Sequence, residues 1–195
     1  MTTKHIVSFS GGLGSWAAAK RVAEQHGTDN LILVFTDTLM EDPDLYRFLI
    51  EAAADVGGEL VWLKDGRNPW QVFRDVKYMG NTRIAHCSKE LKSKPFEKWL
   101  KEQDFDNPII YLGIDWTEEH RLITHRKYVT HRVEAPLCNK PLLSQQQIRQ
   151  MLADTTNIKL PKLYQQGFPH NNCGGTCVKA GQGQWAKVLK LYPKR

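Results

Sequence analysis

The sequence contains no apolar run of 18 residues, no block of like charges, no internal repeat and no low-complexity segment. A membrane-spanning helix is therefore not predicted, and a repeat architecture is not indicated. The first residues enter an apolar strand pattern almost at once and lack the features of a signal peptide. We therefore expect a cytoplasmic protein with no membrane partner.

Two common phosphate-binding motifs are also absent. No glycine-rich loop ends in Gly-Lys-Ser/Thr, and no G-x-G-x-x-G spacing occurs where a dinucleotide fold would place it. What is present is ordinary for a globular chain, with 195 residues, 41% hydrophobic and 25% charged. This length suffices for one domain with a sizeable core. The net charge of +6 favours anionic partners such as nucleotides or nucleic acid.

A stretch rich in glycine and serine lies between a predicted buried strand at 4–9 and a predicted helix at 15–26. A strand that turns into a helix presents bare backbone N–H groups at the positive end of the helix dipole, where an anion binds. Glycines allow the backbone to approach a phosphate closely. A glycine-rich turn without a ligand would give the same pattern. The candidate ligand-binding residues are Ser8, Ser10, Gly11, Gly12, Gly14 and Ser15.

Buried strands are also predicted at 31–35, 59–63 and 108–113, and helices at 43–56 and 145–153. Alternating strands and helices predict an α/β fold, a doubly wound, mostly parallel sheet with helices on both faces. Ligands of such sheets bind beyond the carboxyl ends of the strands, where Thr36, Asp37 and Thr38 also lie. We expect a nucleotide-binding α/β domain at 1–135. A helical, cysteine-containing segment at 136–195 would pack on it.

The loop Ser10–Ser15 resembles the Ser-Gly-Gly-x-x-Ser loop of the ATP pyrophosphatases, also called PP-loop proteins or adenine nucleotide alpha hydrolases. In that superfamily the loop holds the phosphates of ATP, or the sulfate or phosphate groups of a sulfonucleotide. The resemblance implies the corresponding fold, an adenine nucleotide as ligand and a catalytic role for Ser10.

Phe35–Thr38 followed by Glu41 resembles the Phe-x-Asp-Thr-Gly-x-Glu segment of the phosphoadenosine phosphosulfate (PAPS) reductase branch, with Leu39 in place of the usual glycine. By this resemblance Thr36, Asp37 and Thr38 lie near the nucleotide. Asp37 would contact it or a Mg²⁺ ion bridging the phosphates of ATP. The alternative for Asp37 is a turn or N-cap aspartate.

Gly113 begins a stretch that resembles, imperfectly, the Gly-x-Arg-x-x-Glu-Ser-x-x-Arg segment of the same branch, which makes Gly113 a candidate nucleotide-binding residue. Asp115 replaces the first arginine, which leaves Arg121 as the candidate for an anion contact in catalysis. Lys92 is a candidate phosphate contact from a helix, with a solvated helix face as the alternative. The basic residues of 120–132 indicate a nucleic-acid or polyphosphate surface, or simply an exposed amphipathic helix.

The chain has only four cysteines, Cys87, Cys138, Cys173 and Cys177. Disulfides are not expected in the cytoplasm. Four thiolates match a [4Fe–4S] cluster or a structural Zn²⁺. Zinc sites more often use two close pairs, whereas only the Cys-x3-Cys pair is close here. This distribution, with the resemblance to cluster-bearing reductases, favours iron–sulfur. Zinc, a cluster held by Cys87, Cys173 and Cys177 alone, and buried metal-free cysteines are the alternatives.

The resemblance implies an enzyme in which the alpha phosphate of ATP is attacked and a substrate is activated. The activation is coupled to sulfur chemistry on an unknown acceptor, which could be a tRNA or DNA. One alternative is a sulfonucleotide (PAPS or APS) reductase. The Glu-Cys-Gly-x-His motif that carries the nucleophilic cysteine of those reductases is absent from this sequence, which counts against a reductase. Another alternative is a non-catalytic nucleotide sensor or nucleic-acid-binding module. Related proteins often dimerise, so a homodimer is compatible.

Overall fold

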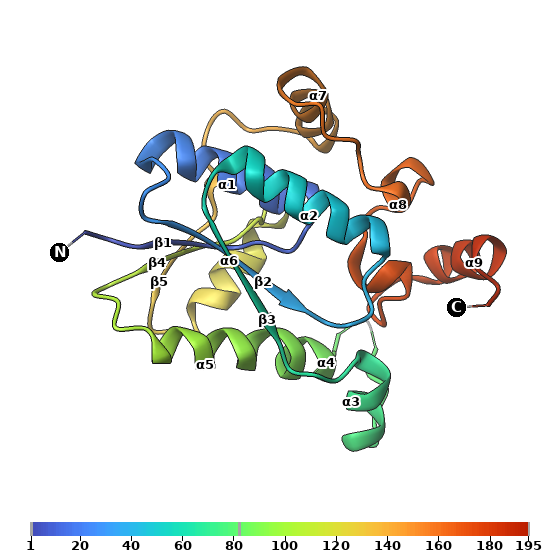
Figure 1. The fold of residues 1–195 in the computed structure, drawn as a ribbon. Coiled ribbons are helices and arrows are strands. Elements are labelled where there is room, and N and C mark those ends of the chain that lie inside the picture. The colour runs from blue at the N-terminus through green and yellow to red at the C-terminus, as the bar shows by residue number, and fades with distance from the viewer. Residues whose placement is uncertain (1, 82, 195) are drawn as a thin grey trace. The chain divides into compact units, whose positions relative to one another are not determined.

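The computed structural model describes residues 2–81 and 83–194 (Figure 1). The chain divides into two compact units that interleave along the sequence. The first unit comprises Met1–Phe35, Arg47–Trp62 and Gln103–Leu160. The second comprises Thr36–Tyr46, Leu63–Glu102 and Pro161–Arg195. The domain limits expected from the sequence, 1–135 and 136–195, stay a prediction.

The sheet has five strands in the order β3-β2-β1-β4-β5. β1 pairs in parallel with β2 and with β4, and β4 pairs in parallel with β5. The four predicted strands are therefore confirmed as β1 to β4. The five strands are β1 (His5–Ser8), β2 (Leu31–Asp37), β3 (Glu59–Lys64), β4 (Ile109–Tyr111) and β5 (Arg132–Glu134).

The longest helices follow the predicted pattern. The longer helices of the chain are α1 (Leu13–His26), α2 (Pro43–Val56), α5 (Lys94–Glu102), α6 (Glu119–Arg126), α7 (Gln145–Thr155) and α9 (Gln182–Leu191). The shorter helices and turns are α3 (Pro69–Asp75), α4 (His86–Ser88), α8 (Lys162–Gln165), a π-helical turn η1 (Lys89–Ser93), and the 3₁₀ turns η2 (Trp116–Glu118), η3 (Pro136–Cys138) and η4 (Asn172–Gly175). No helix in the described part of the chain is long and apolar enough to cross a membrane.

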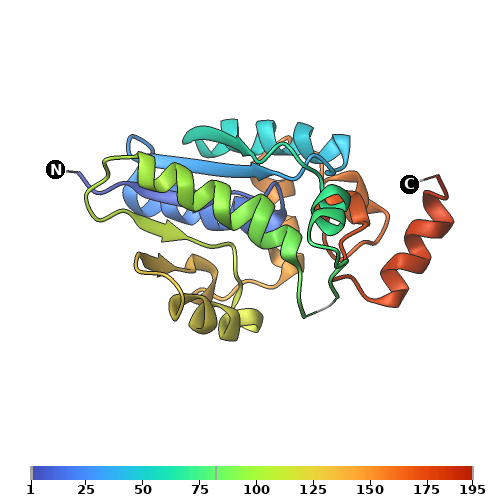
Figure 2. The same ribbon diagram turned by 90° about the horizontal axis from the view of Figure 1, so that it is seen from below.

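The core of the first unit forms around β1. Ile6 and Val7 are fully buried, as is Trp16 on α1. Trp16 keeps its polar atom satisfied, because its Nε1–H donates to Asp55 Oδ2 on α2 at 2.9 Å. α1 and α2 lie on the same face of the sheet (Figure 1), and α6 lies beside β5 (Figure 2). The predicted α/β class is thus confirmed.

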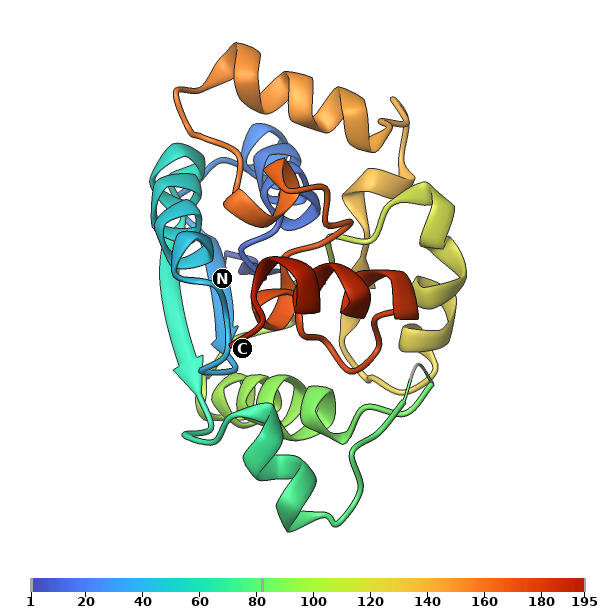
Figure 3. The ribbon, with the colours of Figure 1, turned by 90° about the vertical axis from the view of Figure 1, so that its right-hand side faces the viewer.

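The second unit has its own small core. Leu163, Phe168 and Val188 are buried together, with Tyr192 packed against them. This cluster joins α8 and α9 to the η4 turn, which carries Cys173. Figure 3 shows α9 running across that turn. The C-terminal cysteines are therefore fixed within a packed segment.

Candidate functional site

The loop between β1 and α1 is shaped by its glycines and by Ser15. Gly11 has a left-handed φ of 71°, and Gly12 is the N-cap of α1. Ser15 Oγ donates to the carbonyl of Gly12 at 2.8 Å and accepts from the Gly12 N–H at 3.3 Å. Ser10 is exposed, and its hydroxyl donates to Ser15 Oγ at 3.3 Å. Ser15 therefore holds the loop in shape, and Ser10 is the hydroxyl that a ligand can reach.

Two glycines bring the loop against the end of β4. A Cβ on Gly14 would lie 3.0 Å from the carbonyl oxygen of Gly113. A Cβ on Gly113 would lie 2.8 Å from the backbone nitrogen of Ser15, closer than real Cβ atoms come. The two backbones are in contact because neither residue has a side chain. Gly113 thus positions the loop, a role that the sequence did not reveal.

A cavity of about 320 Å³ opens at this point of the first unit. β2 lies on one side of β1 and β4 on the other, so the strand order reverses here. Open α/β sheets bind ligands in the crevice at such a reversal. The lining residues are Ser8, Ser10, Ser15, Leu112, Gly113, Ile114, Arg121 and His125. Five of these eight were predicted as ligand-binding or catalytic.

Arg121 and His125 give the cavity its basic side. They lie four residues apart on α6 and so share one face of the helix. Arg121 is half exposed and donates to Glu118 at 2.7 Å. From the sequence, His125 was named only as one of the basic residues of 120–132, although its i+4 spacing from Arg121 was a signal for a shared site. A helix N-terminus and two basic side chains around one cavity suit an anionic ligand.

Asp115 stands where the related segment has an arginine, and the structure gives it a structural task. It is buried, and its Oδ1 accepts from the backbone N–H of Thr117 at 2.9 Å. Its Oδ2 accepts from Gln145 Nε2, also at 2.9 Å. Burial works to raise the pKa of Asp115, but these hydrogen bonds outweigh it and lower the pKa. Asp115 therefore caps η2 and fixes the start of the segment that carries Arg121.

In the second unit, Asp37 anchors the turn after β2. Its Oδ1 accepts from the Leu39 N–H and from the Tyr46 hydroxyl, both at 2.8 Å. Burial, followed by this hydrogen bond, raises the pKa of Tyr46. Leu39, which replaces the usual glycine, takes a left-handed φ of 54°. This is the turn role that the sequence analysis gave as the alternative for Asp37.

The carboxylate of Glu41 lies in the same turn, and its side chain is only 2% exposed. Its Oε1 accepts from Thr38 Oγ1 at 2.9 Å, and its Oε2 accepts from the Cys173 N–H at 2.6 Å. Lys92 Nζ lies 4.0 Å from Oε1. Burial works to lower the pKa of Lys92, but Glu41 and the nearby sulfurs of three cysteines outweigh it and raise the pKa. Lys92 therefore interacts electrostatically with Glu41 and with the three cysteines of its own unit.

A side-chain interaction between Cys173 and Cys177 raises the pKa of Cys173 and lowers that of Cys177. The backbone N–H of Lys179 and the charge of Lys92 also stabilise the Cys177 thiolate. Cys87 lies within electrostatic range of Cys177, and burial first, then Cys177, raises its pKa. The three cysteines of this unit therefore influence one another's pKa values.

The structure gives no support for a four-cysteine metal centre. Cys138 belongs to the first unit, where its thiol donates to the carbonyl of Ile114 at 3.6 Å. Cys87, Cys173 and Cys177 belong to the second unit. Across residues 2–81 and 83–194, no group of three or more His, Cys, Asp or Glu is arranged to hold a metal ion. The expected [4Fe–4S] cluster, and zinc in its place, find no support in the donor set.

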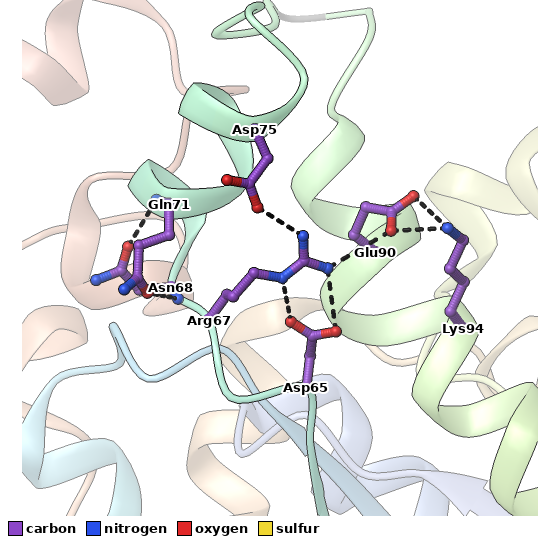
Figure 4. Close-up of polar contacts among 7 residues, drawn as sticks. All are labelled: Asp65, Arg67, Asn68, Gln71, Asp75, Glu90 and Lys94. Atoms are coloured by element: carbon purple, nitrogen blue, oxygen red, sulfur yellow. Dashed lines mark hydrogen bonds and ion pairs between the residues drawn. The ribbon is translucent and has the colours of Figure 1, made fainter.

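The helical segment that carries Cys87 and Lys92 is held in place by Arg67 (Figure 4). Arg67 binds Asp65 at 2.6 Å and 3.1 Å and Asp75 at 2.8 Å. It also lies 3.7 Å from Glu90, which binds Lys94 at 2.7 Å. These ion pairs join α3 to η1. The π-helical turn itself is a rare element that occurs frequently at functional sites.

The predicted site residues thus fall into two groups. The loop residues, Gly113 and Arg121 lie in the first unit, whereas Asp37, Thr38, Lys92 and three cysteines lie in the second. From the sequence, Glu41 was named only as part of a motif. In the structure its side chain links the turn after β2 to the backbone of Cys173. Tyr46 was missed, and nothing in the sequence marks it.

Comparisons with known proteins agree with this fold. The family described as "Phosphoadenosine phosphosulfate reductase domain" matches residues 4–175. An uncharacterized protein of Methanocaldococcus jannaschii is 23% identical over 196 residues, which cover 97% of this chain but only 39% of that protein. The crystal structure of phosphoadenylyl-sulfate (PAPS) reductase from Candida auris, a phosphate complex, superimposes with a TM-score of 0.55 and 15% identity. The match covers 86% of this chain and 80% of that one, and at this identity it shows the fold alone.

Proposed function

Because the chain belongs to the phosphoadenosine phosphosulfate reductase domain family, we propose that it is an enzyme that binds an adenine nucleotide on the loop Ser10–Ser15. In the proposed reaction a nucleophilic atom of the acceptor attacks the alpha phosphate of ATP and bonds to it, the bond between the alpha and beta phosphates breaks, and pyrophosphate leaves. A sulfur nucleophile then displaces AMP from the activated acceptor, for which a tRNA or DNA is a candidate because the chain is basic.

One observation carries the proposal. The cavity of about 320 Å³ lies where the strand order reverses, with the loop on one wall and Arg121 and His125 beside it. Backbone N–H groups at the start of α1 would hold phosphate oxygens. Arg121 would exchange its partner Glu118 for the ligand. The loop would thus stabilise the charge that develops as pyrophosphate leaves, by positioning and electrostatics.

Magnesium is part of this proposal when ATP is the substrate, because it neutralises phosphate charge. Asp37 stays the predicted protein ligand for it, although one of its oxygens already anchors the turn. The iron–sulfur cluster is left out, because the described part of the chain shows no group of three or more His, Cys, Asp or Glu that could hold a metal ion. Free thiols and adenine nucleotides both belong to the cytoplasm, which we propose as the location. A homodimer also stays a prediction.

A second candidate is a sulfonucleotide reductase-like activity. It is favoured by the family itself and by the likeness to the Candida auris reductase, which was solved with phosphate. Here the sulfuryl group would leave the nucleotide and be released as sulfite, with a thiol pair as the source of two electrons. The two candidates differ in their products, since only the first releases pyrophosphate from ATP.

The test combines binding and turnover on the full chain. Calorimetry would measure the affinity for ATP, AMP and a sulfonucleotide, and separate assays would detect pyrophosphate and sulfite. The double variant Ser10→Ala, Gly12→Val should lose both binding and turnover, because it removes the exposed hydroxyl and fills the loop. Unchanged activity in that variant would remove the loop from the mechanism. Tight binding without either product would leave a nucleotide sensor.

A further inference from the structure

The helix α6 presents a row of side chains that starts at the cavity of the first unit. Arg121 and His125 lie four residues apart, and both line that cavity. Tyr128 follows three residues later, and its backbone N–H donates to the His125 carbonyl at 3.0 Å, which continues the last turn of the helix. Residues three or four positions apart lie on one face of a helix. The row therefore leads from the cavity to Tyr128.

Tyr128 is the last residue of this row. In the described part of the chain it is the most exposed of the large hydrophobic side chains, at 82%. Another face of α6 is fixed, because Leu122 is buried and the Nε–H of Arg126 donates to the Val133 carbonyl of β5 at 2.8 Å. β5 is the last strand of the sheet, and α6 lies beside it (Figure 2). The ring is therefore held at a fixed helix end and keeps most of its surface in water.

The segment around this ring carries positive charge and no acid. Four arginines and lysines and three histidines lie within residues 120–133, and no aspartate or glutamate does. Two of the arginines pair with glutamates that flank the segment, at 2.7 Å and 2.6 Å. Arg126 and Lys127 directly precede Tyr128, and the exposed His131 follows it. The ring therefore lies in a segment that attracts anions.

An exposed ring in a cationic segment matches a single-stranded nucleic acid. Any base can stack on an aromatic side chain, and the phosphates beside it bind arginine and lysine. A double helix keeps its base faces covered, whereas the unpaired bases of a single strand are free to stack. Seven residues of helix rise about 10 Å, which is about three nucleotides at a stacked spacing of about 3.4 Å. A strand held at Tyr128 therefore reaches the cavity along the row.

We propose that the acceptor is a single-stranded nucleic acid that lies along α6, with one base stacked on Tyr128 and the adjoining phosphates on Arg126 and Lys127. This inference rests on the proposed function and gives its acceptor a binding surface. The strand continues past the ring towards Arg121 and His125, so that the reacting nucleotide enters the cavity beside the loop. The chemistry of the proposed reaction is unchanged by this surface.

The experiment measures the fluorescence anisotropy of a short labelled DNA strand, and of the RNA strand of the same sequence, with the full chain. Tyr128→Ala should weaken binding about tenfold, because it removes one stacked base. Tyr128→Trp should keep the wild-type affinity, since it keeps an aromatic face. Trp70→Ala is the matched control, because Trp70 is an exposed aromatic residue of the second unit, and it should bind as wild type. Binding of either strand supports the proposal, and the tighter one identifies the sugar.

A salt series tests the phosphate contacts. The logarithm of the affinity falls linearly with the logarithm of the salt concentration, and the slope decreases by about 0.7 for each lost contact to a single strand. Lys127→Gln should therefore reduce the slope. Lys98→Gln removes an exposed charge from α5 in the second unit and should leave the slope as in wild type. Equal slopes for the two variants would contradict the proposed phosphate contact.

Ultraviolet cross-linking of a strand that carries 5-iodouracil, followed by peptide-mass analysis, locates the stacked base without any variant and should identify Tyr128. The proposal is overturned if Tyr128→Ala binds like wild type, if Trp70→Ala loses as much affinity, or if a duplex of the same sequence binds as tightly as the single strand. Wild-type protein that binds ATP but no strand overturns this inference alone. A strand held at Tyr128 by a protein without affinity for ATP overturns the proposed function and leaves the nucleic-acid surface.

Discussion

The nucleotide loop (Ser10–Ser15) and the cysteine turn (Asn172–Gly175) are both tight, glycine-containing turns, yet they are built in opposite ways. The loop uses the absence of side chains, since Gly14 and Gly113 let two backbones touch. The cysteine turn uses side chains, since Glu41 and Thr176 hydrogen-bond to the backbone of Cys173, which has a left-handed conformation, and Lys92 lies 4.0 Å from Glu41. The first presents backbone donors to a ligand, and the second presents sulfur.

The difference predicts how each region responds to substitution. A backbone-built loop tolerates no added atom where the backbones meet, but it depends little on any single charge. A turn held by side chains is less sensitive to changes of shape, but it depends on each side chain that contacts it. Variants that add one carbon atom or remove one charge therefore separate the two regions.

The largest effect is expected from Gly113→Ala. Its Cβ would lie 2.8–2.9 Å from backbone atoms of Gly14 and Ser15, which cannot move aside as a flexible side chain would. We expect a loss of about 1–3 kcal/mol in the free energy of unfolding and a large loss of nucleotide affinity. Urea unfolding and calorimetry would measure the two.

Gly183→Ala is the matched control for that variant. A Cβ on Gly183 would meet nothing within 4 Å, and the residue lies in α9. The same chemical change should therefore leave nucleotide affinity unaltered and stabilise the protein slightly, because alanine favours a helix over glycine. Equal effects of the two variants would show that the contact between the loop and β4 does not matter.

The sequence predicted the backbone-built region better than the side-chain-built one. The order of strands and helices and the position of the loop follow from local patterns, and these were confirmed in β1, β2 and α1. Gly113 was singled out by resemblance, but its contact with Ser15 depends on strand order. The partners of Cys173 could not be predicted, because Glu41 lies 132 positions away along the chain. Buried pairs of this kind leave no local pattern.

A smaller effect is expected from Lys92→Met. Lys92 lowers the pKa of Cys177 by electrostatic attraction, so its loss should raise that pKa. Less thiolate is then present at about pH 7, and alkylation of Cys177 should slow several-fold, since only the thiolate reacts. Rates of iodoacetamide labelling across a pH series, resolved by peptide mass, would measure the shift.

Lys89→Met provides the comparison on the same π-helical turn, where Lys89 is exposed. It removes the same charge from the protein as a whole. If both variants slow the labelling of Cys177 equally, the effect comes from net charge and not from the position of Lys92 near Cys177. That result would make the cysteine turn less dependent on its buried partners than the structure indicates.

The smallest effect concerns the edge of the sheet away from the nucleotide loop, where β1 begins with His5. His5 is stacked on His26 with ring centroids 4.0 Å apart, and its Nδ1 is 2.8 Å from the Tyr111 hydroxyl. Burial first, then the neighbouring His26, lowers the pKa of His5 below its ordinary value of 6.5. The unfolded chain therefore binds this proton more readily than the folded protein.

Stability from His5 should accordingly be complete above pH 6.5 and decline as the pH falls from there through the lowered pKa of the folded state. Urea unfolding over a pH series would show this slope, and His5→Gln should flatten it while keeping a polar partner for Tyr111. His120→Gln removes an exposed imidazole from α6 and should keep the slope. If His5→Gln leaves the slope unchanged, acid sensitivity arises elsewhere. Nucleotide affinity, corrected for the folded fraction, should not follow this pH dependence. If it does, the nucleotide loop depends on the charge of His5, which the comparison of the two turns does not predict.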